Sequence, residues 1–328
     1  MTGKAIYKLP NAQYATRIEG EVVTISRLKD ITEQQGYLVA PFDSLQHPLL
    51  LISAGTVEEV PLVKPTNKSI DIKTEREVSE YTKTFKQFHN AVVHKDLHKV
   101  VLSRTIMIEM VKRDNEEMFW RACKKYPQQM VTMFDTLESG LWLVITPEIL
   151  VKAEGRECAT MALAGTMPAN NNEKWSKKNK QEQQIVREYI RNKIEDISER
   201  IEEQGPYSVT AGSIQHLRSD YRFCIRKDVK LGALLDRLHP TPAVCGLPKD
   251  EAFQFINKYE KYDRRYYSGF SGPLNINGKS IMYVTLRCAE IEKENITLYA
   301  GGGIMPESEM ESEELETRLK MQTIKAII

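Results

Sequence analysis

The strand-like segments of this sequence follow one another in runs, and this order constrains the fold more than any other feature. Residues rich in Val, Ile, Leu and aromatic side chains occur without an intervening helix at 130–135, 141–145 and 149–153, and again at 280–290 and 296–301. Consecutive parallel strands would need a crossover of a dozen or more residues between them. We therefore expect an α/β (α+β) fold of antiparallel or mixed β-sheets flanked by helices.

Helices are predicted where apolar residues recur every three or four positions. The clearest case is 74–95, where Tyr81, Phe85, Phe88 and Val92 share one face. A long polar helix is predicted over 172–204, with a lysine-rich start that we expect to be solvated. The other predicted helices span 115–125, 231–238, 252–260 and 311–324. The other predicted strands span 21–25, 37–39, 49–52, 99–110, 208–211 and 221–225.

The composition limits the class of protein and its partners. The chain has 328 residues, of which 41% are apolar, which is enough to bury one large core. Its formal charge of +1 argues against nucleic acid or an anionic membrane as the main partner. Its five cysteines are odd in number and widely spaced, which is typical of reduced thiols rather than of disulfides or a zinc site. The N-terminus has no apolar signal segment, so we expect a cytoplasmic protein.

Several common enzyme motifs are absent from the sequence. It contains no GxxxxGK[ST] loop, no GxGxxG after a strand, no HExxH and no GxSxG. Phosphate transfer through a P-loop, nicotinamide chemistry, zinc proteolysis and the usual serine esterase chemistry therefore lose support.

A hairpin near the C-terminal end places one arginine in an apolar strand. If residue 292 pairs with 295 across the turn, Arg287 lies opposite Ala300 and beside the glycines 301–303. A buried guanidinium needs an anion or an acidic partner. Glycines let backbone N–H groups approach an anion and form a nest. This pattern indicates a carboxylate site, although a structural arginine–acid pair explains it equally well.

Acidic residues on two predicted helices are candidate metal ligands. Glu313, Glu316 and Lys320 follow the spacing i, i+3, i+7 and share one helix face, and Glu182 lies on the 172–204 helix. Mg²⁺ prefers carboxylate oxygens. Acidic helix faces are more often simply solvated, so this pattern by itself favours a surface.

Lys99 and Glu148 are candidates for proton transfer. Lys99 opens the strand 99–104, and Glu148 follows Thr-Pro between two strands. A lysine and a glutamate that face one pocket act as base and acid when burial lowers the pKa of the amine and raises that of the carboxyl. Taken separately, each residue is more typical of an ordinary surface charge.

Nine segments in a fixed order give these residues a common explanation. They are Lys99-Val-Val-Leu-Ser-Arg, Thr146-Pro-Glu-Ile-Leu, Ala162-Leu-Ala-Gly-Thr, the Glu182 helix, His239-Pro-Thr-Pro-Ala-Val-Cys-Gly, Tyr266-Tyr-Ser-Gly-Phe-Ser-Gly, Thr285-Leu-Arg-Cys-Ala, Ala300-Gly-Gly-Gly-Ile and Glu313-Glu-Leu-Glu-Thr-Arg-Leu-Lys. In this order they resemble the chorismate-binding enzymes, a family that includes isochorismate, anthranilate, aminodeoxychorismate and salicylate synthases. The resemblance covers 74–328 as the catalytic core, with 1–73 as a shortened N-terminal sheet region of a single domain, 1–328.

The resemblance implies a fold, a cofactor and a set of site residues. The fold has two antiparallel or mixed sheets around a central pocket with helices outside, and the cofactor is Mg²⁺. Lys99 matches the base that activates water and Glu148 the general acid, whereas Glu182 and Glu316 match direct metal ligands with Glu313 beside them. The implied substrate-binding residues are Gly165, Thr166, His216, Ala243, Tyr267, Arg287, Gly301, Gly303 and Lys320.

Within this family the resemblance favours isochorismate synthase activity for menaquinone or siderophore biosynthesis. Water would add reversibly to C2 of chorismate while the C4 hydroxyl leaves. Ala164 stands where aminodeoxychorismate synthases typically have a nucleophilic lysine, and the 239–246 segment is similar to isochorismate synthases. A salicylate synthase, an anthranilate or aminodeoxychorismate synthase component I, and a catalytically silent chorismate-binding protein remain the alternatives. We expect a monomer without an obligatory protein partner.

Four positions depart from the pattern of the family. Asn179 stands in place of an acidic residue and Gln183 in place of a histidine, so we expect weaker support around the metal. Glu314 replaces a common tryptophan, and Thr146 replaces a common serine.

Overall fold

One strand, β2 (Tyr14–Ile25), belongs to both β-sheets of this protein. Its N-terminal part pairs with β1 (Thr2–Lys8) and β5 (Thr56–Pro61), and its C-terminal part pairs with β4 (Leu49–Ser53). The two expected sheets are therefore joined into one hydrogen-bonded network. Over the part of the chain that the computed structural model describes, this network contains 18 strands. The described residues are 1–66, 71–78, 80–94, 96–112, 114–169, 174–212 and 214–328.

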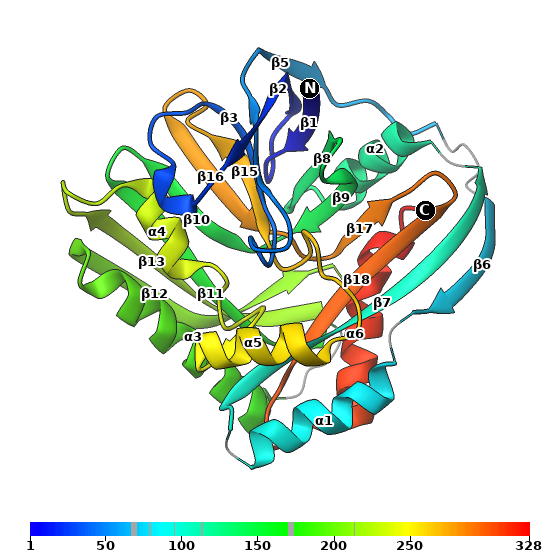
Figure 1. Cartoon of the computed structure of the whole chain (residues 1–328), viewed down its shortest axis with the longest axis vertical. Helices are drawn as coiled ribbons and strands as arrows, with labels where there is room; N and C mark the ends of the chain where they lie inside the picture. Colours follow the sequence, from blue (N-terminus) through cyan, green and yellow to red (C-terminus); the bar gives the residue numbers. More distant parts are fainter. Residues whose placement is uncertain (67–70, 79, 95, 113, 170–173, 213) are drawn as a thin grey trace.

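The strand pairings recorded between the described residues are antiparallel, as the runs of strands predicted (Figure 1). The first sheet combines β1, β2 and β5 with β6 (Asp71–Glu77), β7 (Lys99–Lys112), β8 (Met130–Thr136), β9 (Gly140–Thr146), β14 (Gly246–Leu247), β17 (Cys288–Ile291) and β18 (Asn295–Ile304). The second combines β2 and β4 with β3 (Gly36–Ala40), β10 (Ile149–Glu154), β11 (Glu157–Pro168), β12 (Ser198–Ala211), β13 (Ile214–Ile225), β15 (Phe270–Leu274) and β16 (Lys279–Val284).

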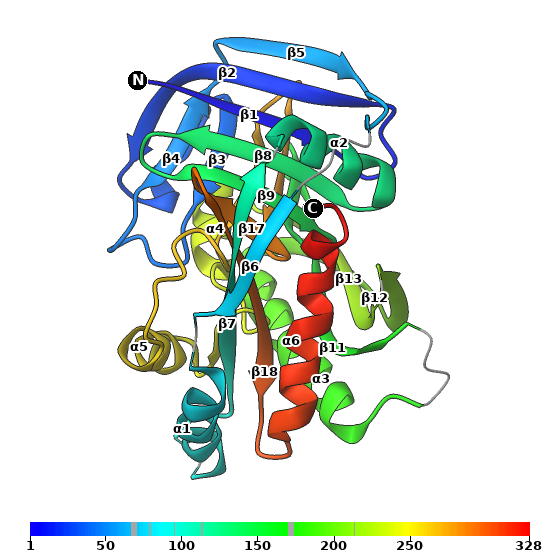
Figure 2. The ribbon, with the colours of Figure 1, turned by 90° about the vertical axis from the view of Figure 1, so that its right-hand side faces the viewer.

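Helices cover the outer faces of the two sheets. The helices α2 (Asn115–Lys125) and α6 (Met310–Lys325) pack on the first sheet, and Figure 2 shows α6 running beside β18. The helices α3 (Lys177–Glu195) and α4 (Leu231–Leu238) pack on the second sheet, and α1 (Tyr81–Val93) and α5 (Lys249–Tyr259) pack on β7. A cluster rich in aromatic side chains, including Tyr37, Phe134 and Trp142, fills the space between the sheets. This layering buries apolar surface on both faces of each sheet.

Capping residues explain where two of these helices begin. The side chain of Asp114 accepts a hydrogen bond from the backbone N–H of Glu117, and that of Ser176 accepts one from the backbone N–H of Asn179. Such N-caps satisfy backbone donors that have no partner within the helix. The α3 cap places the helix start at Lys177, whereas the sequence predicted a start at 172; residues 172 and 173 lie outside the described residues.

Two predicted boundaries are wrong and one strand was missed, because strand pairing overrides the local pattern. The helix expected to reach 204 ends at Glu195, and 198–211 forms β12 against β13. Residues 71–77, partly assigned to a helix beginning at 74, form the strand β6 beside β7, and the helix starts at Tyr81. The strand β11, rich in small residues, was not predicted as a strand at all.

The apolar strand expected at 280–290 is divided between the two sheets. β16 ends at Val284 in the second sheet, and β17 begins at Cys288 in the first sheet. The predicted register is confirmed beyond the break, since Cys288 pairs with Tyr299 and Ile291 with Ile296. Arg287 itself lies in the break, with a φ of 48°. The break therefore directs an arginine from an apolar strand into the space between the sheets.

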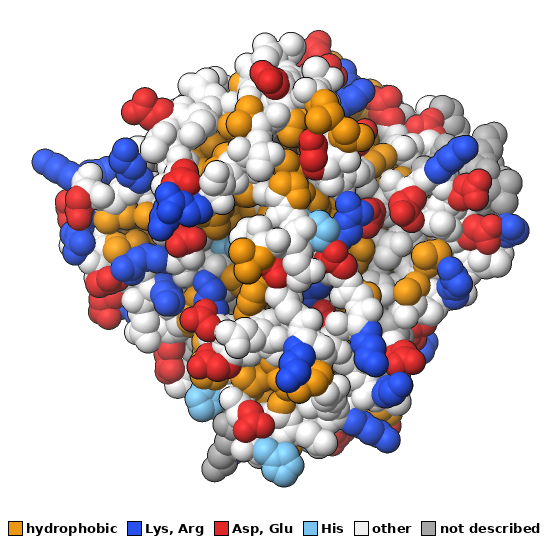
Figure 3. Space-filling view, viewed as in Figure 1, with side chains coloured by type: hydrophobic (Ala, Val, Ile, Leu, Met, Phe, Trp, Pro, Cys, Tyr) orange, Lys and Arg blue, Asp and Glu red, His pale blue; other side chains and the backbone are white. Residues whose placement is uncertain are grey.

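On the face that Figure 3 displays, acidic and basic side chains are interspersed, so neither charge dominates this surface. This agrees with the formal net charge of +1. Among the described helices, none is long and apolar enough to cross a lipid bilayer.

Candidate active site

A pocket with about 620 Å³ of space, its mouth included, lies where β11, β13, β18 and the Arg287 break meet. Most of the residues predicted from the sequence line it, namely Glu148, Gly165, Thr166, Glu182, His216, Ala243, Tyr267, Arg287, Gly301, Gly303 and Lys320. Lys99 and Glu316 do not line it but pair with the lining residues Glu182 and Lys320, and Glu313 lies further out, paired with Lys178. Apolar residues that belong to the quoted segments but were not predicted as site residues, including Pro147, Leu163 and Leu286, complete the lining.

Each carboxylate predicted to bind metal forms an ion pair with a lysine. Lys99 Nζ lies 2.9 Å from Oε1 of Glu182, and Lys320 Nζ lies 2.7 Å from Oε1 of Glu316. The third pair joins α3 to α6, because Lys178 Nζ lies 2.6 Å from Oε1 of Glu313. These pairs bring the two helices and the strand β7 to one edge of the pocket.

The buried carboxylates differ in charge state. Burial opposes ionisation of Glu182, yet Lys99 and Lys178 outweigh it and lower the pKa of Glu182 to about 2. Burial dominates at Glu313 and raises its pKa to about 7, although Lys178 acts in the opposite direction. Glu182 is therefore a carboxylate at neutral pH, whereas Glu313 is close to its midpoint.

Lys178 is a residue whose position the sequence analysis predicted wrongly. It belongs to the lysine-rich start of α3, which we expected to be solvated, but its side chain is only 14% exposed. Lys177 and Lys180 are exposed, as predicted. The i, i+4 spacing between Lys178 and Glu182 was the available signal that this lysine faces the same way as a site carboxylate.

The glycines of β18 make room for side chains and do not form the expected anion-binding nest. Gly301, Gly302 and Gly303 are extended and pair with β7, so their backbone is that of a strand. A Cβ on Gly301 would lie 2.7 Å from the hydroxyl of Tyr267. A Cβ on Gly303 would lie 2.3 Å from Oε1 of Glu182. Lys320 Nζ donates to the carbonyl of Gly301 at 2.7 Å, which fixes this ammonium over the glycine strand.

Among the described residues Arg287 has a histidine and a backbone carbonyl as hydrogen-bond partners, so the alternative of a structural arginine–acid pair is not supported. One terminal nitrogen donates to Nε2 of His216 at 2.5 Å, and the other donates to the carbonyl of Ala211 at 3.3 Å. Burial lowers the pKa of Arg287 to about 10, so the guanidinium remains charged at neutral pH. A buried cation without a paired anion is a strong candidate for binding a carboxylate of a ligand.

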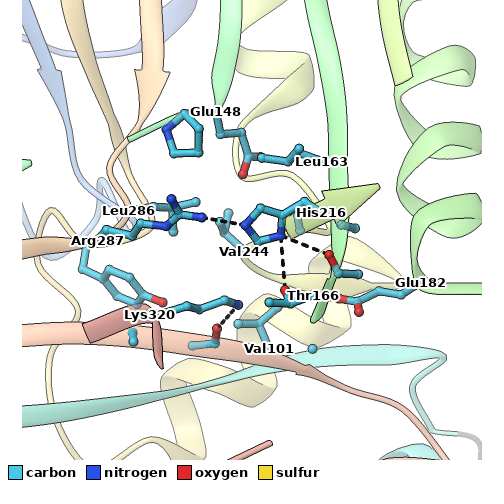
Figure 4. Close-up of a pocket in the computed structure, with 18 residues that line it drawn as sticks. Val101, Glu148, Leu163, Thr166, Glu182, His216, Val244, Leu286, Arg287 and Lys320 are labelled. Carbon is cyan, nitrogen blue, oxygen red and sulfur yellow. Dashed lines mark hydrogen bonds between the residues drawn. The ribbon is translucent and has the colours of Figure 1, made fainter. Parts of the chain in front are cut away.

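Glu148 lines the same pocket as Glu182, and in Figure 4 the ring of His216 lies between the two side chains. Glu148 is 4% exposed, and burial raises its pKa to about 7 against the opposing effect of Lys99, Lys320 and Arg287. Its backbone N–H donates to the hydroxyl of Thr146 at 3.2 Å, so the threonine at this position supports the turn. A carboxyl with this pKa can give up a proton near neutral pH.

The three acids offer the donors that Mg²⁺ prefers. Oε2 of Glu313 is buried and has no hydrogen-bond partner within the described residues. A Cβ on Gly302 would lie 3.0 Å from this oxygen and 3.7 Å from Oε1 of Glu316, so both oxygens face one point. Within the same part of the chain, no three acidic, histidine or cysteine side chains converge closely enough to form a ready-made cation site. The donor set fits a divalent cation once the lysine pairs rearrange.

All four departures from the family pattern have structural roles of their own, that of Thr146 being in the turn before Glu148. Asn179 donates to the carbonyl of Thr166 at 3.1 Å, and Gln183 donates to the carbonyl of Ala162 at 3.1 Å. Both amides therefore tie α3 to β11 and add no charge near the acids. Glu314 accepts hydrogen bonds from Arg318 at 2.7 Å and from the buried Arg104 of β7 at 3.3 Å.

The fold and this arrangement of acids, lysines and arginine define a class of enzyme that binds a small anion, and the comparisons with known proteins agree. Residues 3–328 match the family of chorismate binding enzymes, and the chain belongs to that family.

Relatives in the family include isochorismate synthases. The chain is 29% identical to the vibriobactin-specific isochorismate synthase of Vibrio cholerae, over 75% of this chain and 66% of that protein. It is 28% identical to the isochorismate synthase EntC of Escherichia coli, over 69% of this chain and 61% of that protein. The matched part thus spans less than two thirds of the length of these relatives. The fold resembles that of DhbC from Bacillus anthracis, with a TM-score of 0.86, 24% identity, and coverage of 98% of this chain and 95% of that chain.

Proposed function

We propose that this chain is an isochorismate synthase, which converts chorismate reversibly into isochorismate with the help of Mg²⁺. One observation carries the proposal: a buried glutamate with a pKa of about 7 lines the same pocket as a carboxylate that is ion-paired to a buried lysine. The names of the relatives from Vibrio cholerae and Escherichia coli support the same activity.

The proton balance of the reaction requires a base and an acid. Attack of water on C2 of the ring releases a proton, and departure of the C4 hydroxyl as water consumes one. Lys99 is paired with Glu182 as an ammonium, so it would receive the first proton at Nζ only in its neutral form, after it has given up the proton of that pair. Glu148 would donate the second, because its raised pKa keeps a large fraction protonated near neutral pH. Since two different residues take these roles, neither needs to move between the two steps.

Chorismate carries two carboxylates, and the pocket offers two cationic groups at separate places. Arg287, held by His216, would bind the pyruvyl carboxylate together with the hydroxyl of Tyr267. Lys320, held on the glycine strand, would bind the ring carboxylate. Apolar side chains such as Leu163 and Val244 would contact the ring itself. Two anchors fix the ring relative to the acid and the base.

Glu182 and Glu316 would hold Mg²⁺ directly, with Glu313 beside them. The unpartnered Oε2 of Glu313 supports this assignment. When bound, the cation would neutralise the ring carboxylate and orient the ring. The lysines that now pair with these acids remain available to balance charge in the site.

The chain is proposed to act alone, as one catalytic domain in the cytoplasm. The groups assigned to chemistry line one pocket of this chain or pair with acids and lysines beside it. The five cysteines are free and buried, which fits a reducing compartment.

The test is to incubate the purified chain with chorismate and Mg²⁺, with and without ammonium, and to separate the products by chromatography. Isochorismate alone is expected, and its formation should be lost with a chelator and in Lys99→Ala. Salicylate with pyruvate would identify a salicylate synthase. An aminated product that requires ammonium would identify an anthranilate or aminodeoxychorismate synthase component. Absence of any product would contradict an enzymatic role.

A further inference from the structure

Lys178 lies between two of the acids assigned to the metal. Its Nζ is 2.6 Å from Oε1 of Glu313 and 3.9 Å from Oε2 of Glu182. Glu182 shares α3 with Lys178, whereas Glu313 belongs to α6. The ammonium therefore links two helices through two carboxylates at the edge of the pocket.

This lysine keeps its charge in spite of its burial. Burial opposes the ammonium form, but Glu182 and then Glu313 outweigh it and raise the pKa of Lys178 above its ordinary value. The two carboxylates at 2.6 and 3.9 Å thus favour the ammonium form of Lys178 at this place. The chemistry assigned to Lys99 and Glu148 makes no use of Lys178.

The position of Glu313 adds an independent observation. Its Oε1 accepts hydrogen bonds from both Lys178 and the hydroxyl of Ser308, at 2.6 and 2.7 Å. Its Oε2 is buried and has no hydrogen-bond partner within the described residues. This free oxygen faces the same point beside Gly302 as Oε1 of Glu316. Lys178 therefore neutralises one side of a carboxylate whose other side faces the expected place of the cation.

We propose that Lys178 is a resident counter-cation that competes with the divalent cation for Glu182 and Glu313. It stabilises the acids when no divalent cation is bound, and it repels the cation when one binds. The affinity for Mg²⁺ is consequently lower than three carboxylates would otherwise give. This inference rests on the proposed use of Mg²⁺. In it, one residue, Lys178, determines the concentration of Mg²⁺ that the protein requires.

The test compares Mg²⁺ binding by the full chain and by Lys178→Gln, using isothermal titration calorimetry with and without chorismate. Because the substitution removes a unit charge within about 4 Å of two carboxylates, we expect the Mg²⁺ dissociation constant to fall roughly tenfold. Without Mg²⁺ the variant should melt at a lower temperature than the parent, and saturating Mg²⁺ should close that gap. A dissociation constant equal to or higher than that of the parent would overturn the proposal.

Two further variants separate competition from a merely structural role. Lys180→Gln removes an exposed lysine two residues along the same helix and should leave the Mg²⁺ affinity unchanged. Lys178→Arg keeps the charge and should bind Mg²⁺ as weakly as the parent. If Lys178→Gln does not fold, tighter binding by Lys178→Arg than by the parent would still overturn the proposal. Failure of the parent chain to bind Mg²⁺ under either condition would instead contradict the metal in the proposed function, and this inference with it.

Discussion

His216 accepts a hydrogen bond through Nε2 from Arg287 while its Nδ1 lies 3.0 Å from the carbonyl oxygen of Gly165. A carbonyl can only accept, so the proton must reside on Nδ1 and the lone pair on Nε2. Burial, with Arg287 and Lys320 in addition, lowers the pKa of His216 well below its ordinary value. A neutral histidine in one tautomer thus holds the arginine that we assign to the pyruvyl carboxylate.

Replacing His216 should therefore weaken binding of chorismate more than it slows turnover. In His216→Leu the buried guanidinium loses an acceptor, which costs about 1–3 kcal/mol and corresponds to a rise in KM of roughly 5- to 150-fold. His216→Gln offers a carbonyl acceptor and should recover part of this loss. Steady-state kinetics of the two variants measure the difference. Equal KM values for His216→Leu and the parent chain would show that Arg287 needs no such support.

The rate should fall as the pH rises through about 7, because Glu148 must be protonated to act as the acid. Burial raises the pKa of this carboxyl to about 7, so its protonated fraction decreases above that pH. Glu148→Gln cannot donate a proton, and we expect kcat to drop by roughly 10²- to 10⁴-fold. A pH profile of kcat for the parent chain provides the measurement. A rate that keeps increasing from pH 6 to pH 9 would rule out Glu148 as the acid.

The same carboxyl should make the protein less stable at higher pH. With a raised pKa, folded Glu148 binds a proton between its ordinary value and about pH 7, whereas the unfolded chain does not, so stability decreases as the pH rises through this window. Glu148→Gln should accordingly increase the free energy of unfolding by up to about 3 kcal/mol at pH 8. The gain should vanish near pH 4. Denaturant unfolding at both pH values measures it, and a loss of stability at pH 8 would contradict the buried, uncharged carboxyl.

Much of the fold could be predicted from residue patterns, and the errors have a common cause. Helices with a strong apolar face or a clear cap, such as α2 and α4, lie at their predicted residues. The wrong assignments concern β6 and β12, polar strands that are held by pairing: β6 pairs with β7 across the intervening helix α1, and β12 pairs with β13 in a hairpin. Local periodicity contains no information on such pairing. The break at Arg287 was also missed, because both halves of that segment are apolar in the same way.

For the candidate site, too, one part could be predicted from the sequence and another part could not. Motif order brought together residues from β7, β11, α3, β18 and α6, and the structure places most of them around one pocket. What the sequence did not reveal is how their charges are arranged. The partners of Glu313 and Arg287, which are Lys178 and His216, depend on contacts between elements far apart in the chain. Helical spacing relates Lys178 to Glu182 only, and nothing in the sequence relates His216 to Arg287.

The buried pair between Lys99 and Glu182 should be needed for both stability and activity. Lys99→Ala leaves the carboxylate of Glu182 without its nearest cation, and we expect a loss of about 3–5 kcal/mol in the free energy of unfolding. The double variant Lys99→Met with Glu182→Leu removes both charges and should recover most of that stability without recovering activity. Denaturant unfolding and product analysis distinguish the two. Full stability of Lys99→Ala would show that the pair is not essential to the fold.

Replacing single glycines of β18 by alanine should test the site while leaving the fold in place. A Cβ at Gly303 would lie 2.3 Å from Oε1 of Glu182 and 2.6 Å from Cε of Lys99, so Gly303→Ala must displace both side chains. We expect a cost of about 1–3 kcal/mol in stability and a loss of activity of a hundredfold or more, since the base and a metal ligand both move. Gly302→Ala is the matched control on the same strand, because its closest contact is Oε2 of Glu313 at 3.0 Å. That variant should keep Lys99 in place and raise the Mg²⁺ requirement more than it lowers kcat at saturating Mg²⁺. Parent-like kinetics for Gly303→Ala would mean that Lys99 and Glu182 are not where the reaction takes place.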